Sequence, residues 1–198
     1  EKKIITSKIE HPSVLNPCRQ LEEQGVEVHY LDVDGSGRID MDDLEAQITE
    51  PTALISLQHA NSETGVLQNI KRASEIARNK GILFHTDAVQ SVAKIPFDLK
   101  NYPVDLLSIS AHKFYGPKGV GALYLRKGTP ALFSPLCGGN QEKKRRGGTE
   151  NVAGIMGFGK ACELANENIS ETSKLADLRD YFQNRVCELI PRTELWGD

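Results

Sequence analysis

Long apolar runs are missing from this sequence of 198 residues. No run approaches the roughly 20 apolar residues of a membrane-spanning helix, and the opening stretch 1–11 (EKKIITSKIEH) lacks the apolar core of a signal peptide. We therefore expect a soluble, cytoplasmic protein without a membrane partner. The chain does not start with Met, and its first residues already have the pattern of a strand. We interpret it as an interior segment of a longer protein.

Cysteine is scarce and scattered. The sequence holds four cysteines, at Cys18, Cys137, Cys162 and Cys187. They form neither a CxxC pair nor a cluster with histidine, which argues against a zinc site and against a disulfide scaffold. We expect most of them to be small, buried, apolar side chains.

A strong positive charge is also absent, since the net charge is −3. With 39% hydrophobic and 26% charged residues, the chain is not disordered by composition. A nucleic-acid partner would need a basic surface that this composition does not favour, so small-molecule chemistry fits better. At a prior of about 150 residues per domain, the length allows one substantial core, or a core plus part of another.

Short apolar segments alternate with helical patterns along most of the chain. The predicted strands are 3–7, 26–31, 53–57, 82–85, 104–110 and 120–125. The predicted helices between and after them include 13–24, 41–48, 69–80 and 173–190. This alternation predicts an α/β fold with a largely parallel sheet and helices on both faces.

Two of these strands end in polar residues that can carry chemistry. Asp87 follows the strand 82–85, and His112 and Lys113 follow the strand 104–110. In open α/β sheets, ligands bind beyond the carboxyl ends of the parallel strands. The pair suggests pyridoxal phosphate, which needs an amine for covalent attachment and a carboxylate to keep its pyridine nitrogen protonated. On spacing alone, a solvated loop lysine and an N-cap aspartate are the more common interpretation.

The residues around this pair resemble a known family. The segments 85–91 (HTDAVQS) and 108–125 (SISAHKFYGPKGVGALYL) are similar to the cofactor-binding core of cysteine desulfurases, pyridoxal-phosphate enzymes of the aminotransferase class V superfamily. RRGGTENV at 145–152 resembles the nitrogen-fixation and iron–sulfur-assembly branch. The resemblance implies the large cofactor domain of pyridoxal-phosphate fold type I over 1–190, only partly present. Residues 191–198 would begin a small C-terminal domain with a new strand.

The resemblance also implies which residues act on the ring of the cofactor. Lys113 would bind the cofactor covalently and then remove the Cα proton of the substrate, while Asp87 would keep the pyridine nitrogen protonated. His11, in the segment 7–11 (SKIEH), would stack on the ring, which suits a flat imidazole that exchanges protons near neutral pH. A lone histidine is otherwise more often a structural hydrogen-bonding residue.

Five further residues would bind the cofactor by the same resemblance. Asn61 would lie near the ring oxygen and the substrate, although alone it would be interpreted as a turn residue that bonds its own backbone. Gln90, three residues after the aspartate, would donate to the phenolic oxygen. Ser110 and His112 would hold the phosphate. Thr149 would reach the phosphate of the neighbouring subunit, which implies a homodimer.

The implied reaction converts L-cysteine to L-alanine. Sulfur would pass to a cysteine persulfide on the enzyme and then to a sulfur-acceptor or iron–sulfur scaffold protein. The family's nucleophilic cysteine lies in a C-terminal Ser/Gly-rich loop, and no cysteine here has that setting; Cys137 in PLCGGN is the nearest imitation. The family's N-terminal phosphate loop and its arginine for the substrate carboxylate are also absent, so we expect this segment alone to be inactive. Another class V enzyme, a transaminase or lyase, is the alternative.

The segment 32–45 (DVDGSGRIDMDDLE) supports a different interpretation, a non-catalytic calcium-binding module. Positions 1, 3, 5, 6, 8, 9 and 12 of a calcium loop would be Asp32, Asp34, Ser36, Gly37, Ile39, Asp40 and Asp43. However, an EF-hand needs a helix before the loop, whereas 26–31 alternates like a strand, and position 12 carries Asp instead of Glu. We therefore favour a turn that opens the helix 41–48, and no metal site.

Glycines occur in two groups. The turn 116–121 (GPKGVG) lacks the GxxxxGK[ST] spacing of a nucleotide phosphate loop, so we expect a tight turn into the following strand. Gly154, Gly157 and Gly159 lie inside a helical pattern, where glycine reduces stability unless close packing requires it.

Overall fold

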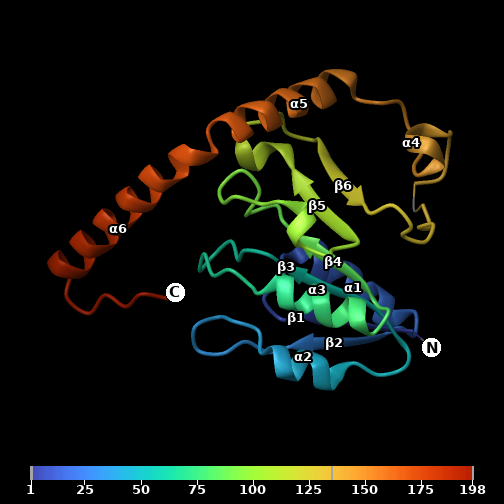
Figure 1. Cartoon of the computed structure of the whole chain (residues 1–198), viewed down its shortest axis with the longest axis horizontal. Helices are drawn as coiled ribbons and strands as arrows, with labels where there is room; N and C mark the ends of the chain where they lie inside the picture. The colour runs from blue at the N-terminus through green and yellow to red at the C-terminus, as the bar shows by residue number, and fades with distance from the viewer. Residues whose placement is uncertain (1, 135, 198) are drawn as a thin grey trace.

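The structure is a computed structural model that describes residues 2–134 and 136–197. It contains a six-stranded sheet in the order β2-β1-β3-β4-β5-β6 (Figure 1). The strands are β1 (Lys3–Ser7), β2 (Glu27–Leu31), β3 (Thr52–Gln58), β4 (Leu83–Asp87), β5 (Leu106–Ser110) and β6 (Gly121–Leu125). β1 to β5 are parallel, and β6 runs antiparallel to β5. The largely parallel sheet expected from the sequence is confirmed.

The four helices predicted with bounds lie within one residue of their predicted ends. They are α1 (Pro12–Glu23), α2 (Met41–Gln47), α3 (Ile70–Asn79), α4 (Gln141–Lys144), α5 (Val152–Glu167) and α6 (Thr172–Leu189), with 3-10 helices η1 (Leu99–Asn101), η2 (Ala111–Phe114) and η3 (Ile169–Glu171). The ends of α1 follow from its sequence. Pro12 suits the first helical position, and Gly25, with φ of 86°, adopts the left-handed conformation just past the helix end.

Helices cover both faces of the sheet, as predicted. Successive side chains of a strand point to opposite faces. In β2, Leu31 packs in the core with α2 and α3, whereas the hydroxyl of Tyr30 donates to Glu22 of α1 at 2.7 Å. The topology explains this arrangement. From β1 the chain moves to one side to form β2 and then in the opposite direction to form β3 and β4, so right-handed connections place α1 opposite α2 and α3.

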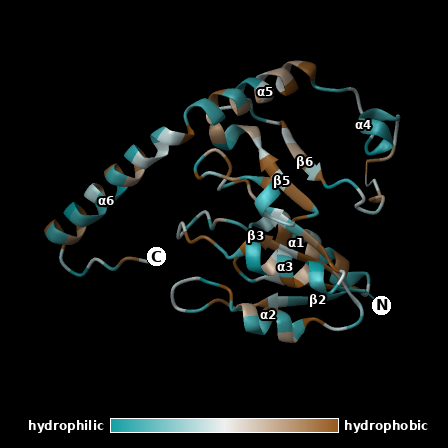
Figure 2. Cartoon of the chain, viewed as in Figure 1, coloured by the Kyte–Doolittle hydropathy of each residue, from teal (hydrophilic) through white to brown (hydrophobic). Residues whose placement is uncertain are grey.

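The main hydrophobic core lies between the sheet and the helices α2 and α3. Ile5, Ile55 and Phe84, on three adjacent strands, are completely buried there, and Ile70 and Ile76 of α3 pack onto them. Burial of each such side chain contributes roughly 1.5–3 kcal/mol. Figure 2 shows the hydrophobic strands and the more polar outer helix faces. This core holds the ends of β1, β3 and β4 at fixed positions.

A second, smaller cluster fixes η2, the turn that follows β5. Its centre is the ring pair Phe114 and Phe158, whose centroids lie 5.8 Å apart. At Gly157 a Cβ atom would lie 2.8 Å from the side chain of Pro117, so α5 approaches this turn closely. The close packing that would explain a glycine inside a helix is therefore present at Gly157. At Gly159 a Cβ would meet nothing within 4 Å.

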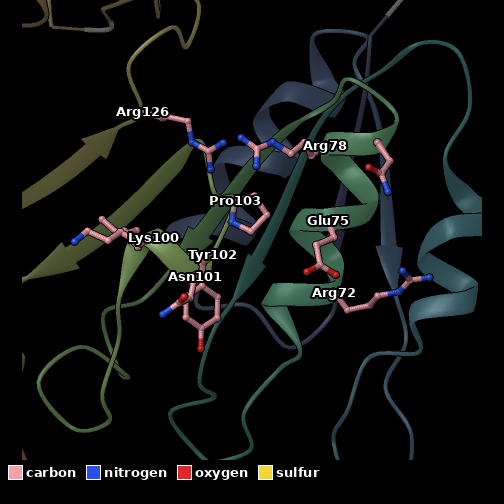
Figure 3. A pocket seen from close by; sticks show the side chains of 10 residues that line it. Arg72, Glu75, Arg78, Lys100, Asn101, Tyr102, Pro103 and Arg126 are labelled. Carbon is pink, nitrogen blue, oxygen red and sulfur yellow. The ribbon is translucent and has the colours of Figure 1, made fainter.

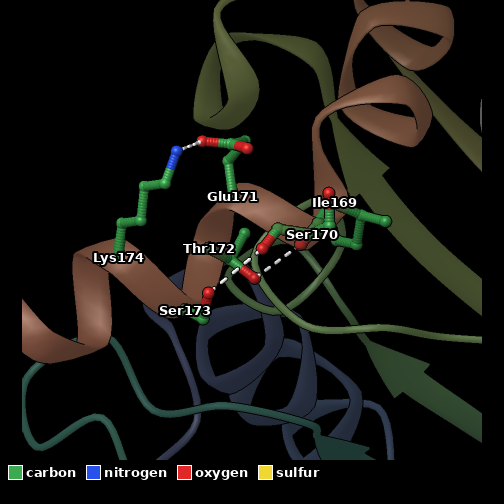
Figure 4. Close-up of polar contacts among 6 residues, drawn as sticks. All are labelled: Ile169, Ser170, Glu171, Thr172, Ser173 and Lys174. Carbon is green, nitrogen blue, oxygen red and sulfur yellow. Dashed lines mark hydrogen bonds and ion pairs between the residues drawn. The ribbon is translucent and has the colours of Figure 1, made fainter.

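Side-chain bonds join η3 to the first turn of α6 (Figure 4). The hydroxyl of Thr172 donates to the carbonyl of Ile169 at 2.7 Å, and that of Ser173 donates to Ser170 at 3.1 Å. Beyond this joint, α6 extends away from the sheet (Figure 1). None of the described residues of α6 is buried, and its largest apolar side chains, such as Leu175 and Phe182, are exposed. Leu178, for example, keeps 62% of its surface exposed.

The cysteines depart from prediction. Cys18 is buried in α1, but three are exposed, namely Cys137, Cys162 and Cys187. The expectation that most would be buried is wrong, because α5 and α6, which carry Cys162 and Cys187, pack only a little of their surface against the described chain, and Cys137 lies in an exposed loop.

The C-terminal segment also differs from prediction. We expect a new strand there, but residues 192–197 form no strand, and Asp198 lies outside the described residues. No helix in the described part of the chain combines the length and apolar character needed to cross a membrane.

Candidate functional site

One cavity, of about 260 Å³, lies beyond the carboxyl ends of the parallel strands. Its lining comes from the segments that follow β1, β3, β4 and β5. Six of the candidate residues line it: His11, Asp87, Gln90, Ser110, His112 and Lys113. The connections change direction between β1 and β3, so the cavity lies at the topological switch point, where α/β sheets bind ligands.

Asp87 is the last residue of β4 and is half-buried at the cavity. Its Oδ1 accepts a hydrogen bond from the backbone N–H of Val89 at 2.9 Å, so the carboxylate also shapes the turn after the strand. Two residues earlier, on the same face of β4, His85 lies 2.8 Å from the hydroxyl of Ser56 and 2.9 Å from that of Ser108. Burial lowers the pKa of His85, against the opposing effect of Asp87. The imidazole of His85 therefore links three strands, two residues before the carboxylate.

Ser110, His112 and Lys113 reach the cavity from the junction of β5 and η2. The buried residues Ala111 and Phe114 anchor η2 in the second cluster, so the two residues between them are exposed at its surface. The Oγ of Ser110 lies 2.8 Å from Nδ1 of His112. The turn after η2 is tight, as predicted: at Gly116 a Cβ would lie 2.9 Å from the carbonyl oxygen of Ala111.

His11 is the N-cap of α1. Its Nδ1 accepts from the backbone N–H of Ser13 at 3.2 Å and lies 2.8 Å from the Ser13 hydroxyl. A cap of this kind satisfies a free N–H at the helix start and fixes the orientation of the ring. His11 therefore has a structural role as a cap, through Nδ1, and also lies at the cavity.

Gln90 has a partner that sequence reasoning missed. The ammonium group of Lys94 donates to Oε1 of Gln90 at 2.8 Å. With its oxygen engaged in this way, the amide keeps its N–H groups available. Burial and the nearby charge of Lys113 lower the pKa of Lys94. A charged residue four positions after Gln90 within one turn is the signal that sequence reasoning could have used.

Two candidate residues do not line the cavity. Oδ1 of Asn61 accepts from the backbone N–H groups of Glu63 and Thr64, both at 2.9 Å, so Asn61 is the turn residue of its own loop. Its Nδ2 donates to the carbonyl of Ile9 at 3.2 Å, which ties this loop to the segment after β1. Thr149 is exposed, beyond α4.

A buried acid beside the cavity was missed by sequence reasoning. Glu10 is only 4% exposed. Burial, more than the nearby Asp87, raises the pKa of Glu10 to about 7, although hydrogen bonds from Gln58 and Ser7 act in the opposite direction. The signal was present in the sequence, because Glu10 lies among polar residues at a predicted strand end.

The carboxylates of the calcium-loop segment serve the turn and the helix. Oδ1 of Asp34 accepts from the backbone of Ser36 at 2.8 Å and of Arg38 at 2.9 Å, and these bonds lower the pKa of Asp34. Asp40 caps α2 by accepting from the N–H of Asp42 at 2.8 Å. The turn that opens a helix, preferred from the sequence, is therefore confirmed. In the described residues, no group of three His, Cys, Asp or Glu side chains is arranged to hold a metal ion.

A larger cavity of about 480 Å³ lies at the opposite edge of the sheet, beside η1 and the start of β5 (Figure 3). Arginines dominate it, and two of them lie near carboxylates. Arg72 is 3.8 Å from Glu45, and Arg126 is 3.8 Å from Asp105. None of the candidate residues lines this cavity, so we assign the functional site to the smaller one.

Comparison with known proteins agrees with the sequence. The family model described as aminotransferase class-V matches residues 1–195. A relative named cysteine desulfurase IscS, from Dictyoglomus turgidum, is 56% identical over 197 residues, which cover 99% of this chain and 50% of that protein. The chain spans about half the length of the curated relatives it matches.

Solved structures give the same result. A NifS-like protein superimposes with a TM-score of 0.92 at 42% identity, and the match covers 96% of this chain and 53% of the NifS-like chain. A structure titled "SspA in complex with cysteine" superimposes with a TM-score of 0.80 at 43% identity, over 82% of this chain and 47% of its own. The resemblance and the fold type expected from the sequence are thereby confirmed.

Proposed function

Because the chain belongs to the aminotransferase class-V family, we propose that its cavity binds pyridoxal phosphate and that the whole protein is a cysteine desulfurase. The observation that carries the proposal is the set of side chains at the cavity. An amine, a carboxylate, an imidazole and an amide meet there from separate segments of the chain. These are the groups that attach the cofactor and control the charge of its ring, so the residues present fit it.

At the ring, each side chain has one chemical task. The bound cofactor supplies an electron sink for the carbon whose C–H bond breaks. Lys113 is the amine that attaches it and afterwards accepts the Cα proton. Asp87 holds a proton on the pyridine nitrogen through a charge-assisted hydrogen bond. His11, fixed by its cap on α1, packs over the ring, and Gln90 donates to the phenolic oxygen with the amide group that Lys94 leaves available.

The hydroxyl of Ser110 and the imidazole of His112 lie 2.8 Å apart and would together hold the phosphate. Thr149 lies outside the cavity and completes the phosphate site of a second copy. A homodimer is also supported by the exposed apolar side chains of α5 and α6, which need a partner or the rest of the whole protein. Asn61 does not line the cavity, so its proposed role near the substrate is indirect, through the loop that it organises.

The substrate proposed is L-cysteine, and the products are L-alanine and a persulfide. The names of the relatives and the cysteine bound to SspA support this choice. A cysteine thiolate of the whole protein forms a sulfur–sulfur bond while the carbon–sulfur bond of the substrate breaks, and the carbon takes the electron pair and a proton. A sulfur-acceptor or iron–sulfur scaffold protein then receives the sulfur. The free thiols suit the reducing cytoplasm, where we place the protein.

The nucleophile lies outside these residues in our proposal. None of the described cysteines lines the cavity. Burial raises the pKa of Cys18 and of Cys162, which reduces the thiolate fraction of both. We propose accordingly that 1–190 form most of the large cofactor domain and that the sulfur-accepting cysteine belongs to the part of the whole protein beyond it.

The cofactor assignment is tested by covalent trapping. The protein is mixed with pyridoxal phosphate, reduced with borohydride and digested, and the labelled lysine is identified by mass spectrometry. We expect the label on Lys113 and its loss, with loss of the visible absorbance band, in Lys113→Ala. Lys118→Ala, a change at an exposed lysine of the next turn, is the control and keeps the label. A label that stays on another lysine in Lys113→Ala contradicts the assignment.

The reaction is tested by its products. With L-cysteine and a thiol reductant, which reduces the persulfide and releases its outer sulfur as sulfide, a desulfurase gives alanine and sulfide in equal amounts, whereas a class V transaminase gives a keto acid and no sulfide. The whole protein is expected to give alanine and sulfide. Keto acid without sulfide would replace the proposed reaction by transamination and would leave the role of Lys113 unchanged.

A further inference from the structure

Glu10 is a buried acid for which the proposed reaction has no use. It lies between β1 and α1, where β1 and β3 end side by side. Its Oε1 accepts from the backbone N–H of Gln58 at 2.9 Å and from the hydroxyl of Ser7 at 2.7 Å. Its Oε2 is buried and has no hydrogen-bond partner. A buried polar atom without a partner is uncommon in native proteins and calls for an explanation.

The bonds around Glu10 fasten the segment that carries His11 to the end of β3. Gln58 binds this segment twice, since its N–H donates to Glu10 and its Nε2 donates to the carbonyl of Ile9 at 2.7 Å. Asn61 donates to the same carbonyl at 3.2 Å. Gln58 and His11 both line the cavity. Glu10 does not line the cavity itself, but it is hydrogen-bonded to one lining residue, Gln58, and precedes another, His11, in the sequence.

The surroundings of Glu10 disfavour a negative charge. Asp87 at the end of β4 repels it, and from α1 it faces the thiol of Cys18. His11, beside it in sequence, turns its Nδ1 toward Ser13. Glu10 takes part in none of the ion pairs found in the described chain. A buried carboxylate without a cation is costly, and the usual solution is that the group keeps its proton.

We propose that Glu10 works as a protonated, uncharged carboxyl that positions His11 over the cavity and leaves Asp87 as the only carboxylate charge there. In many sites the surroundings of two neighbouring carboxyls push their pKa values apart, so that one is charged while the other keeps its proton. Glu10 is a positioning residue: Gln58 anchors it, and it acts on the cavity through His11. The part of this proposal that concerns the cofactor rests on the proposed function.

Glutamine is the matched substitution for a protonated glutamate. In Glu10→Gln, the amide oxygen can still accept from Gln58 and Ser7, and the NH₂ group replaces the O–H at Oε2. Glu10→Ala removes the acceptor and leaves the N–H of Gln58 unpaired. Where Glu10→Ala does not fold, Glu10→Asp takes its place, since the shorter side chain withdraws the acceptor. Glu23→Gln, an exposed change on α1, is the control.

The first measurement needs no cofactor. Infrared difference spectra are recorded from about pH 5 to pH 9, across the range in which Glu10 is expected to lose its proton. We expect the carbonyl band of a buried protonated carboxyl to disappear with a midpoint near 7, to be absent from Glu10→Gln and to persist in Glu23→Gln. A spectrum without such a band in the wild-type protein overturns the proposal.

The second measurement is the affinity for pyridoxal phosphate, followed by visible absorbance. We expect Glu10→Gln to bind within about threefold of wild type and Glu10→Ala to bind about tenfold more weakly or worse, because only the second loses the acceptor. In a His11→Ala background, Glu10→Ala should cost no more than about twofold, as expected for a residue that acts through His11. Equal losses in Glu10→Gln and Glu10→Ala would show that the charge is needed and overturn the proposal.

The two measurements separate this proposal from the proposed function. If the wild-type protein binds no pyridoxal phosphate, the proposed function fails, and with it the role of Glu10 at a cofactor site. The infrared result still decides whether Glu10 carries a proton. If the cofactor binds and Lys113 is labelled but no protonated carboxyl is found, the proposed function stands and the role given to Glu10 is wrong.

Discussion

Replacing Glu10 by glutamine should change how the stability of the folded chain depends on pH. The pKa of Glu10 is raised from 4.5 to about 7, mainly by burial. Below pH 4.5 the group is protonated in both the folded and the unfolded chain, so it gives the free energy of unfolding no dependence on pH. Between these values the unfolded chain has released the proton and the folded chain retains it. The unfolded state then binds fewer protons, so the free energy of unfolding falls as pH rises.

The size of the effect follows from the shift. One pKa unit corresponds to about 1.4 kcal/mol, so the free energy of unfolding should fall by about 3 kcal/mol between pH 4 and pH 8 on account of Glu10. Glu10→Gln has no such dependence. For a chain of this length, 1 kcal/mol shifts the melting temperature by roughly 2–4 °C, so the difference between variant and wild type should grow by roughly 6–12 °C over this range.

The assay is urea or thermal unfolding of wild type, Glu10→Gln and Glu23→Gln at a series of pH values. His59 acts in the opposite direction, because burial lowers its pKa to about 4. Its contribution to stability is present above pH 6.5 and is lost as pH falls toward 4, but it is common to all three proteins and cancels in the differences. A difference between Glu10→Gln and wild type that stays constant with pH would refute the reasoning, since Glu10 would then titrate alike in both states.

Three further predictions concern other parts of the chain. Asp87→Asn should weaken pyridoxal phosphate binding about ten- to a hundredfold, because a charge-assisted hydrogen bond is worth about 1.5–3 kcal/mol; an absorbance titration that finds unchanged affinity, as expected for the exposed control Glu63→Gln, contradicts the role. Gly157→Ala should destabilise the chain by about 1–3 kcal/mol in urea unfolding, since its Cβ would lie 2.8 Å from Pro117, whereas Gly159→Ala, which meets nothing within 4 Å, should not. Millimolar calcium should not raise the melting temperature, and a rise that is lost in Asp32→Ala would restore the calcium-binding interpretation.

The sheet and its helices could be predicted because their signals are local. Each strand is a short apolar segment, and each of the first three helices buries one face, as α3 does with Ile70 and Ile76. Local patterns also place Asp87 and Lys113 at strand ends, and parallel strands bring such ends to one edge of the sheet. What the pattern could not give is the exposure of α5 and α6. Their apolar residues satisfy a helical period, but the surfaces that would cover them are not in the described chain.

Some contacts beside the site join residues that are distant in sequence, and these limit sequence reasoning most. Glu10 meets Gln58 because β1 and β3 are neighbours in the sheet, a pairing that only the topology fixes. Asn61 could be assigned to the cavity or to its own turn, and the choice depends on whether its oxygen is free; the loop engages that oxygen. A sequence identifies residue types at strand ends. Partners within four positions engage His11, the oxygen of Asn61 and Gln90. The carboxyl of Glu10, in contrast, depends on Gln58, 48 positions away.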